Sequence, residues 1–417
     1  MNLLKFKNSI STRVLKCVLA ATVILSCSDD DAVPNLGTLE IQLQLASGLS
    51  NIPLSDIPVK ITNTTDNSES EANTDASGQI MFENIAAGTY NIIVSQSTDD
   101  YNLSGTANDI IVSRQETINE IIEINAVDPN AGLVIKEVYC VGANDGFVSL
   151  FKDQFIEIFN NSSETLFADG LYVANLFGET GTAGEDTPIT DVLSTDEFVY
   201  ANLIDQIPGS GQDYPIESGK SIVIALNAVN YKEGNPQADE AQDNTDATLE
   251  RYSVEWLEAQ GRIGNTFFDL DNPSVPNMTN IYIYEATNFY SFNSYGAGAI
   301  LISGDATFSD SDIVDYTKTG STNTFKLMRV PVDQVLDGVE ILENSQAASF
   351  KRMPNAIDAG FHFVNADGGA FYSGKSSRRI KDETASARFG RVILQDTNNS
   401  SVDFESIESP DKYGYNQ

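Results

Sequence analysis

Apolar and polar residues alternate along residues 37–126, and this period of two is typical of half-buried β-strands. Gly78 and Gly88 stand between the alternating stretches, where a hairpin needs a permissive backbone. Two further apolar stretches, residues 109–113 and 117–125, follow in the same region. The pattern therefore predicts a β-sandwich of short strands. Its expected core positions are Leu39, Ile41, Leu43, Leu45, Val59, Ile61, Ile80, Phe82, Tyr90, Ile92 and Val94.

A polar stretch that contains proline and glycine, residues 126–132, predicts a linker to a second domain. We place the first domain at residues 37–126 and the second at residues 131–417. Residues 155–159 are almost continuously apolar, which is typical of a strand that is buried on both faces. Gly219 predicts a tight turn that leads into a strand through Ile222 and Ile224.

The second domain carries two acidic insertions rich in glycine and asparagine, residues 181–215 and 231–250, which we expect to form surface loops. Leu249, Tyr252, Trp256 and Leu257 recur at helical spacing and predict one amphipathic helix. Strand character returns at residues 281–303. We therefore expect a mainly β fold with a few short helices.

Residues 74–94 contain the string T-D-x-x-G-x-I-x-F-x-x-I-x-x-G-x-Y-x-I-x-V. The string resembles the carboxypeptidase regulatory-like module. That resemblance implies an immunoglobulin- or prealbumin-like β-sandwich that acts as a spacer or a docking surface, and we interpret this domain as a stalk. Function does not follow from the fold alone.

The second domain shows E-V at residue 137, F-I-E-I-x-N-x-S at residue 155 and S-G-x-S-I-V-I at residue 218, an order that resembles the lamin-tail immunoglobulin-like domain. With "SFKRMPNAIDAGF" at residue 349 and "LQDTNNSSVDF" at residue 394, the chain resembles an uncharacterised family of Bacteroidota lipoproteins. In that family a regulatory-like module precedes an enlarged lamin-tail-like β-sandwich, and no catalytic residues come with the resemblance.

The N-terminus combines four basic residues within the first 16 with a short apolar run, residues 17–26. The run is too short to span a bilayer, so the pattern is typical of a secretory signal peptide. Leu25, Ser26 and Cys27 end it and resemble the bacterial lipobox, which implies cleavage after residue 26 and lipidation of Cys27. We expect a partnership with the membrane through this anchor.

Three aspartates, residues 29–31, follow Cys27 within the predicted acidic tether at residues 27–36. They resemble the acidic export tag of surface lipoproteins in Bacteroidota, which implies the outer face of the outer membrane. A plain solvated tether is the alternative.

The chain has 60 acidic and 24 basic residues, a formal net charge of −36. Such a surface repels nucleic acid, which we therefore exclude as a partner. His362 is the sole histidine, so a His-rich zinc site is excluded and a catalytic triad would depend on this one residue. Three cysteines, one of them inside the signal peptide, provide no disulfide framework, and Cys140 is expected to be a buried thiol.

Residues 369–376, "GAFYSGKS", satisfy the formal pattern of a phosphate-binding loop. Such a loop needs a buried strand before it and a helix after it, whereas both flanks here are polar. We interpret the string as a chance match.

Acidic residues offer further candidates for chemistry. Asp310, Asp312 and Asp315, and separately Asp269 and Asp271, cluster in sequence but lack the pattern of an EF-hand loop. Hydrogen bonds that cap turns explain these aspartate clusters. A structural calcium ion is the alternative that stays open. We expect no other cofactor. Sixty acids single out no glycosidase pair, and G-x-S-x-G is absent, so an enzyme is the weaker hypothesis.

Two groups of residues are candidates for ligand binding. A basic cluster suits carboxylate or phosphate groups, although pairing with the protein's own acids is the alternative. An aromatic stretch suits stacking on sugars or contact with a partner, although packing into a core is the alternative. The basic candidates are Lys375, Arg378, Arg379 and Lys381, and the aromatic candidates are Tyr282, Tyr284 and Tyr290, next to Phe289, Phe292 and Tyr295.

The sequence thus favours an outer-membrane lipoprotein that faces outward and binds rather than catalyses. Similar surface lipoproteins serve uptake through TonB-dependent transporters, so the resemblance implies an accessory role with such a transporter as partner. The alternatives are an extracellular hydrolase with a carboxylate or metal site, and a structural or adhesive surface protein.

Overall fold

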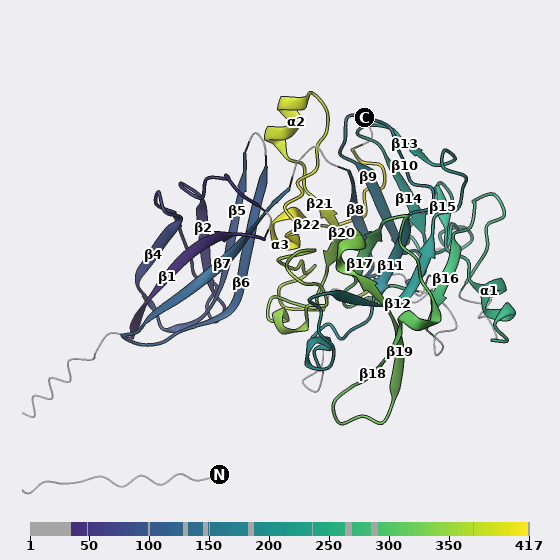
Figure 1. The fold of residues 1–417 in the computed structure, drawn as a ribbon. Coiled ribbons are helices and arrows are strands. Elements are labelled where there is room, and N and C mark those ends of the chain that lie inside the picture. Colours follow the sequence, from purple (N-terminus) through teal and green to yellow (C-terminus); the bar gives the residue numbers. More distant parts are fainter. Residues whose placement is uncertain are drawn as a thin grey trace, which may run out of the picture.

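The computed structural model describes residues 35–47, 49–98, 101–127, 132–144, 149, 151–181, 187–235, 237–262, 269–284, 291–369 and 371–415. They form two β domains that lie side by side (Figure 1). The fold class expected from the sequence, mainly β with a prealbumin-like first domain and a few short helices, is confirmed.

The first domain is a sandwich whose strands hydrogen-bond in the order β3-β2-β5-β6-β7-β1-β4. Its strands are β1 Leu36–Leu45, β2 Pro58–Asn63, β3 Glu69–Asn73, β4 Gln79–Ala86, β5 Gly88–Ser97, β6 Asn102–Val112 and β7 Thr117–Val127. The β1 strand pairs antiparallel with β4 and parallel with β7. One layer is β4-β1-β7 and the other is β3-β2-β5-β6, and the two are joined where β6 meets β7.

The predicted alternation decides which side chains fill this sandwich. Leu39, Ile41 and Leu43 on β1 are buried, and so are the apolar positions expected on β2, β4 and β5. Gly78 has a φ of 76° and makes the expected turn. Gly88 serves close packing instead, because a Cβ there would lie 2.9 Å from the Asn63 amide nitrogen.

The larger domain packs two sheets against each other. The first has the order β15-β14-β9-β8-β21-β22, and the second has the order β18-β19-β12-β11-β17-β20 with β16 beside β12. A small β10-β13 pair stands apart. The strands are β8 Leu133–Tyr139, β9 Phe155–Asn160, β10 Leu166–Phe167, β11 Tyr172–Leu176, β12 Phe198–Gln206, β13 Pro215–Ile216, β14 Ser221–Ala225, β15 Leu249–Glu250, β16 Thr279–Ile283, β17 Gly298–Ile302, β18 Ile313–Thr317, β19 Thr324–Pro331, β20 Val335–Glu340, β21 Ser376–Arg379 and β22 Phe404–Ile407.

The main core lies between these two sheets. It gathers Ile135, Phe155 and Ile222 from the first sheet and Val173 and Leu301 from the second. All six residues of β9 are buried, as the apolar run at residues 155–159 predicts.

The helices are short, as expected. They are α1 Val254–Ala259, α2 Glu383–Phe389 and α3 Ser400–Asp403, with 3₁₀ turns η1 Ile189–Asp191, η2 Asp310–Asp312, η3 Val332–Gln334 and η4 Ala348–Phe350. The predicted amphipathic helix is wrong at its start, because Leu249 belongs to β15 and pairs in parallel with Ile224 of β14. Burial of Leu249 in the main core overrides the helical spacing.

The expectation that residues 181–215 form only surface loops is also wrong. They contain β12, a strand that pairs with β11, β16 and β19 inside the second sheet. Val199, Leu203 and Ile204 on β12 are almost fully buried. The acidic residues around this apolar stretch dominate the composition of the segment and conceal the strand.

The first domain is docked on the second through polar contacts from β6 and β7. The Asn102 amide donates to the backbone oxygen of Asp396 at 3.2 Å, and the Asn125 amide donates to that of Asn355 at 3.0 Å. The Ser104 and Thr106 hydroxyls donate to the backbone oxygens of residues 397 and 359. The C-terminal segment that includes α3 therefore lies between the two sandwiches (Figure 1). The first domain, which we interpreted as a stalk, therefore forms a defined interface with the larger domain.

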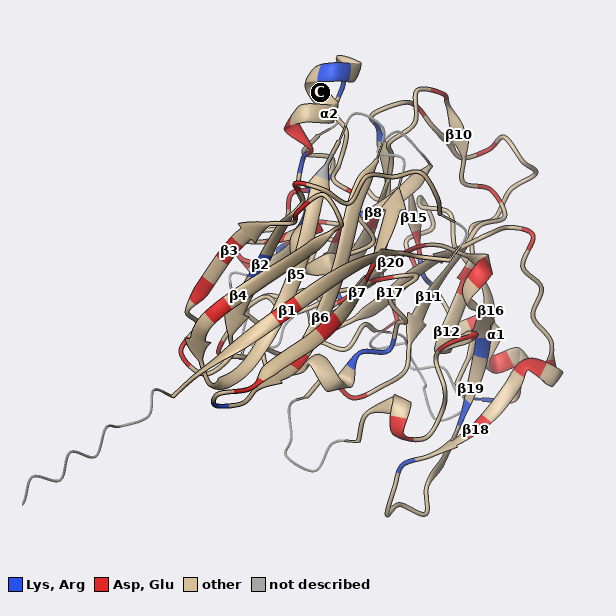
Figure 2. Cartoon of the chain, turned by 60° about the vertical axis from the view of Figure 1, so that its left-hand side comes forward, with Lys and Arg blue, Asp and Glu red and all other residues tan. Residues whose placement is uncertain are grey.

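Acidic positions occur on both domains (Figure 2). Within the described residues, no helix has the length and apolar character needed to cross a membrane. The predicted signal peptide and the Cys27 lipidation site precede residue 35 and so lie outside the described residues.

Ile41→Ala should lower the free energy of unfolding of the first domain by about 2–5 kcal/mol, because it opens a cavity in a packed core. Urea denaturation followed by circular dichroism measures the change. The matched control is Ile121→Ala on the neighbouring strand β7, where the side chain is 64% exposed, and the change should stay within about 0.5 kcal/mol. Equal effects of the two substitutions would contradict the assignment of inner and outer faces.

Candidate functional site

Two hollows lie on the described surface next to Asp196, which lines both. The first, here called the acidic hollow, has a volume of about 760 Å³. The second, the junction hollow, has a volume of about 580 Å³ and lies where the two domains meet. Because the two hollows share Asp196, we treat them together as the candidate functional site and call them the groove.

Strand ends and tight turns build the acidic hollow. Phe198 at the start of β12 pairs with Pro331 at the end of β19. The η3 turn follows directly, held by the Val332 amide, which donates to the Glu197 backbone oxygen at 3.0 Å. A turn that begins at Ser303 supplies the opposite side, since the Ser303 amide donates to the Gln334 backbone oxygen at 2.9 Å.

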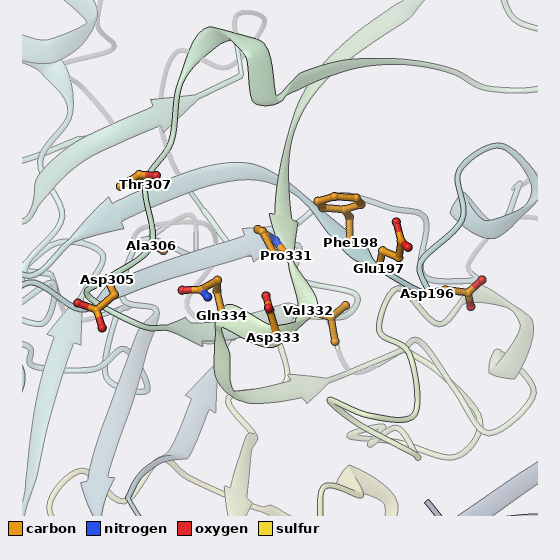
Figure 3. A pocket seen from close by; sticks show the side chains of 10 residues that line it. All are labelled: Asp196, Glu197, Phe198, Asp305, Ala306, Thr307, Pro331, Val332, Asp333 and Gln334. Atoms are coloured by element: carbon orange, nitrogen blue, oxygen red, sulfur yellow. The ribbon is translucent and has the colours of Figure 1, made fainter. Parts of the chain in front are cut away.

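The acidic hollow carries four carboxylates, and no cationic side chain is among its lining residues. Figure 3 shows Asp305 and Gln334 at one end and Asp196 and Glu197 at the other, with Pro331 between them. The Asp196 carboxylate accepts a hydrogen bond from the Ser194 hydroxyl at 3.0 Å. Asp196, Glu197, Asp305 and Asp333 are all exposed, so their charges remain solvated.

The junction hollow takes its lining from both domains. Thr106, Asn108 and Glu123 come from β6 and β7, and the larger domain contributes residues 348, 349, 351 and 353–356. Lys351 is anchored there, because its ammonium donates to the Asp358 backbone oxygen at 2.7 Å. Burial lowers the pKa of Lys351, an effect that the charges of Asp358 and Glu340 oppose.

This arrangement suits the binding of a polar ligand. The lining supplies carboxylates, amides and hydroxyls that accept or donate hydrogen bonds, together with one aromatic ring, Phe198. A polar ligand, neutral or positively charged, matches these groups.

The structure pairs the predicted basic residues with acids of the protein. Lys375 lies 2.7 Å from Glu408, Lys381 lies 2.8 Å from Glu383, and Arg378 contacts Glu405 and Asp411 at 2.7 Å each. These contacts favour the alternative of internal ion pairs, and a role in ligand binding stays a prediction for these residues.

Arg379 is buried, with 1% of its surface exposed. Its guanidinium holds both carboxylate oxygens of Asp337, at 2.9 and 2.8 Å, and one of Asp396 at 3.1 Å. It also donates to the backbone oxygen of Ile135 at 2.9 Å. These contacts surround the guanidinium, so its place in the structure is that of a core cation.

The two candidate tyrosines among the described residues also pack inward. Tyr282 is buried, and its hydroxyl donates to the Lys326 backbone oxygen at 2.8 Å. Tyr284 is half-buried, with its ring 5.5 Å from that of Phe325. Tyr290 lies outside the described residues, and ligand binding stays a prediction for this group. None of the six described candidates lines the groove.

Other reactive side chains are enclosed. Cys140 is a buried free thiol, as predicted, and burial raises its pKa to about 12. His362 is buried, its Nε2 lies 3.2 Å from the Ser406 hydroxyl, and burial lowers its pKa to about 4. Neither residue is placed to act on a solvent-borne substrate.

A buried carboxylate pair lies beneath the C-terminal segment, residues 411–415. Lys136 holds Glu157 at 2.8 Å, and the backbone amides of Asp411 and Tyr413 donate to Glu137 and Glu157 at 3.2 and 3.0 Å. Burial raises the pKa of Glu137 to about 7, and the charge of Glu157 adds to the effect. The pair is sealed from solvent, which argues against its use by a hydrolase.

The aspartate clusters are tied into turns. Asp312 caps η2 by accepting from the Ser309 amide and hydroxyl, and Asp269 accepts from the Ser253 amide at 3.0 Å. Among the described residues, no three His, Cys, Asp or Glu side chains gather as metal ligands. The calcium alternative stays an untested prediction.

The sequence reasoning missed the groove. Asp196 and Glu197 fell inside a segment interpreted as a loop, although the apolar stretch FVYANLI at residues 198–204 is a strand signal that locates them at a strand end. Asp333 and the turn at residues 303–307 join them through strand pairing that no local pattern shows.

Two family models match the chain. One, described as "Protein of unknown function (DUF4876)", matches residues 217–411, and the other, a prealbumin-like fold domain, matches residues 42–126. No curated protein matches the chain.

Among solved structures, a DUF4876 family protein from Bacteroides thetaiotaomicron is 25% identical, over 88% of this chain and 94% of that one, with a TM-score of 0.53. A type II cohesin–X-dockerin complex from Acetivibrio cellulolyticus is 18% identical, over 22% of this chain and 58% of that one, with a TM-score of 0.16. The major pilin SpaD from Corynebacterium diphtheriae is 12% identical, over 46% and 57%, with a TM-score of 0.19. The last two scores are too low to carry an argument.

These matches confirm the resemblance to an uncharacterised family of Bacteroidota with a prealbumin-like module. The descriptions of the two matching families name no catalytic activity. The lamin-tail likeness of the larger domain stays a prediction.

Arg379→Met should lower the free energy of unfolding of the larger domain by about 3–5 kcal/mol, because it leaves buried carboxylates without their cation. The neighbouring Arg378→Met is the matched control and should cost at most about 1 kcal/mol, since its partners Glu405 and Asp411 are partly exposed. Guanidinium denaturation measures both, and equal losses would contradict the assigned role of Arg379.

Because the pKa of Glu137 is raised in the folded protein, the free energy of unfolding should fall as pH rises from about 4.5 to about 7. The folded carboxyl has a pKa of about 7 and the unfolded one a pKa near 4.5, so the folded state binds more protons in this window. The loss at pH 8 amounts to about 3 kcal/mol relative to pH 4. Urea denaturation of Glu137→Gln across this range should give a correspondingly flatter profile, and a slope identical to that of the parent protein would refute the prediction.

Proposed function

We propose that this chain, which combines a region of the uncharacterised family DUF4876 with a prealbumin-like module, is a lipid-anchored surface protein that binds a ligand or partner in the groove between its domains. In this proposal it acts without catalysis, as an accessory component of TonB-dependent uptake at the outer membrane. The observation that carries the binding role is the pair of hollows that meet at Asp196.

The proposed location rests on the N-terminal sequence. A basic segment, a short apolar run and Cys27 in a lipobox-like context support export and lipidation, and residues 29–31 support display on the outer face. Several acyl chains hold a protein firmly on a membrane, since each buried methylene contributes about 0.8 kcal/mol.

The proposed binding mode rests on the composition of the groove. Exposed carboxylates in the acidic hollow attract ammonium groups and accept hydrogen bonds from hydroxyls. Residues of both domains line the junction hollow, so a ligand there would contact each of them. The interface contacts of β6 and β7 hold the two sides of the junction hollow together, which favours a site formed before the ligand arrives.

A pull-down of the tagged protein from its native membranes in mild detergent tests the proposal. We expect near-equimolar recovery of an outer-membrane transporter with the parent protein. The variant Asp196→Asn, Glu197→Gln, Asp333→Asn should lose this partner while keeping its fold, because all three side chains are exposed.

Two controls separate the parts of the proposal. Cys27→Ala should move the protein from the membrane to the soluble fraction, and full retention would refute the anchor. A triple variant at exposed acids outside the groove, Glu69→Gln, Glu71→Gln and Glu83→Gln, keeps the same net charge as the groove variant. Loss of the partner in both triple variants, or recovery of the parent protein alone, would contradict the groove as the binding site.

A further inference from the structure

Four aromatic rings from three separate loops gather just beyond the end of β8. The rings of Tyr295 and Phe371 stack in parallel, 4.7 Å apart with 7° between their planes. The ring centroid of Phe371 lies 3.9 Å from that of Tyr372, and the ring centroid of Tyr372 lies 5.9 Å from that of Phe151. We call this set the aromatic platform.

The backbone beneath the platform is held in an unusual conformation. Phe151 and Tyr372 have φ values of 56° and 55°, in the left-handed region that bulky residues rarely adopt. Two hydrogen bonds of 2.9 Å fix the second segment, from the Tyr372 amide to Val141 and from the Gly374 amide to Gly142. Such positions cost free energy and recur at binding sites, where the surrounding structure maintains them.

Gly142 allows the rings to approach. A Cβ at this residue would lie 2.8 Å from the Cβ of Phe151 and 3.3 Å from the ring of Tyr372. Its φ of 76° is also in the left-handed region. Three features therefore converge on one arrangement of the rings: the absent side chain at residue 142, the paired backbone, and the two left-handed aromatic residues.

The platform reaches the surface. Tyr295 is 37% exposed, and Phe151, Phe371 and Tyr372 are half-buried. Exposed Asn293 stands beside Tyr295, and its side-chain oxygen accepts from the Tyr295 amide at 3.0 Å. An aromatic face bordered by a hydroxyl and an amide offers stacking and hydrogen bonding together.

The charge of the protein restricts what can stack there. A net charge of −36 repels nucleic acids and acidic polysaccharides, although their rings would fit an aromatic face. A neutral pyranose ring presents an apolar C–H face and hydroxyl groups around its edge. It matches the platform in shape, polarity and charge.

We propose that the aromatic platform is a binding site for neutral glycans, in which the exposed ring of Tyr295, backed by the parallel ring of Phe371, stacks on a pyranose ring. The platform shares no residue with the hollows that meet at Asp196, so the proposal goes beyond the groove and does not depend on it. The two sites can be tested separately with the same protein.

Affinity electrophoresis and titration calorimetry of the full-length protein in detergent test the proposal, with dextran, xylan, glucomannan and galactan as probes. We expect at least one of these neutral polymers to bind. Tyr295→Ala should weaken that binding about tenfold or more, because it removes the exposed ring. Tyr295→Phe keeps the ring and should stay within about threefold of the parent protein.

The matched control is Tyr101→Ala, where the side chain is 40% exposed on the first domain, and it should bind like the parent. Thermal denaturation checks that each variant is folded. Binding of none of the four polymers would overturn the proposal, and so would unchanged glycan binding by Tyr295→Ala. In the latter case a protein partner becomes the candidate occupant.

Discussion

The guanidinium of Arg379 is a buried cation that joins the two sheets of the larger domain to its C-terminal segment. Arg379 lies on β21, between β8 and β22, and contacts the backbone of β8 within its own sheet. Its bidentate contact with Asp337 reaches β20 in the opposite sheet, and Asp396 ties in the C-terminal segment. Burial raises the pKa of Asp337 and Asp403, to about 7 each, and the adjacent positive charge of Arg379 opposes that shift. A buried charge is tolerated only with such partners, so these residues must come together for the domain to fold.

The same network positions the docking surface for the first domain. The side chain of Asp396 accepts a hydrogen bond from the guanidinium of Arg379. Its backbone oxygen accepts one from the side-chain amide of Asn102 on β6. Nearby, Glu340 accepts from the guanidinium of Arg352 at 2.7 Å and from its backbone amide at 2.6 Å. Asp358 then accepts from the Glu340 and Ser400 amides at 2.8 Å each. These contacts fix residues 352–360, of which residues 353–356 line the junction hollow, so the shape of the hollow depends on buried charges.

The two candidate binding sites differ in how the fold presents them. The groove is wide and acidic, and it is formed where strand ends and two domains meet. The aromatic platform is small, and the backbone at Phe151 and Tyr372 holds it in a rarely adopted conformation. A protein with both features can contact a ligand or partner through two chemically distinct surfaces, one that suits polar groups and one that suits flat apolar rings.

Local sequence patterns determined the strands of the first domain with their inner faces, and some strands of the larger domain, because alternation along a strand directly decides which side chains face the core. The positions Leu39, Ile41 and Phe82, the buried strand at residues 155–159 and the buried thiol of Cys140 all follow from such local reasoning. The prediction that Cys27 is lipidated also comes from a local pattern, and it concerns residues that precede the described part of the chain.

Only the tertiary structure decided which polar residues meet. Arg379 and Arg378 are adjacent in sequence and look equivalent, yet neighbours on a strand point to opposite faces, so one lies in the core and the other near the surface. Asp196 and Asp333 share a hollow because β12 pairs with β19, and Tyr295 meets Phe371 because two distant loops end beside β8. Contacts of this kind join residues that are far apart along the chain, so hydrophobic periodicity carries no information about them.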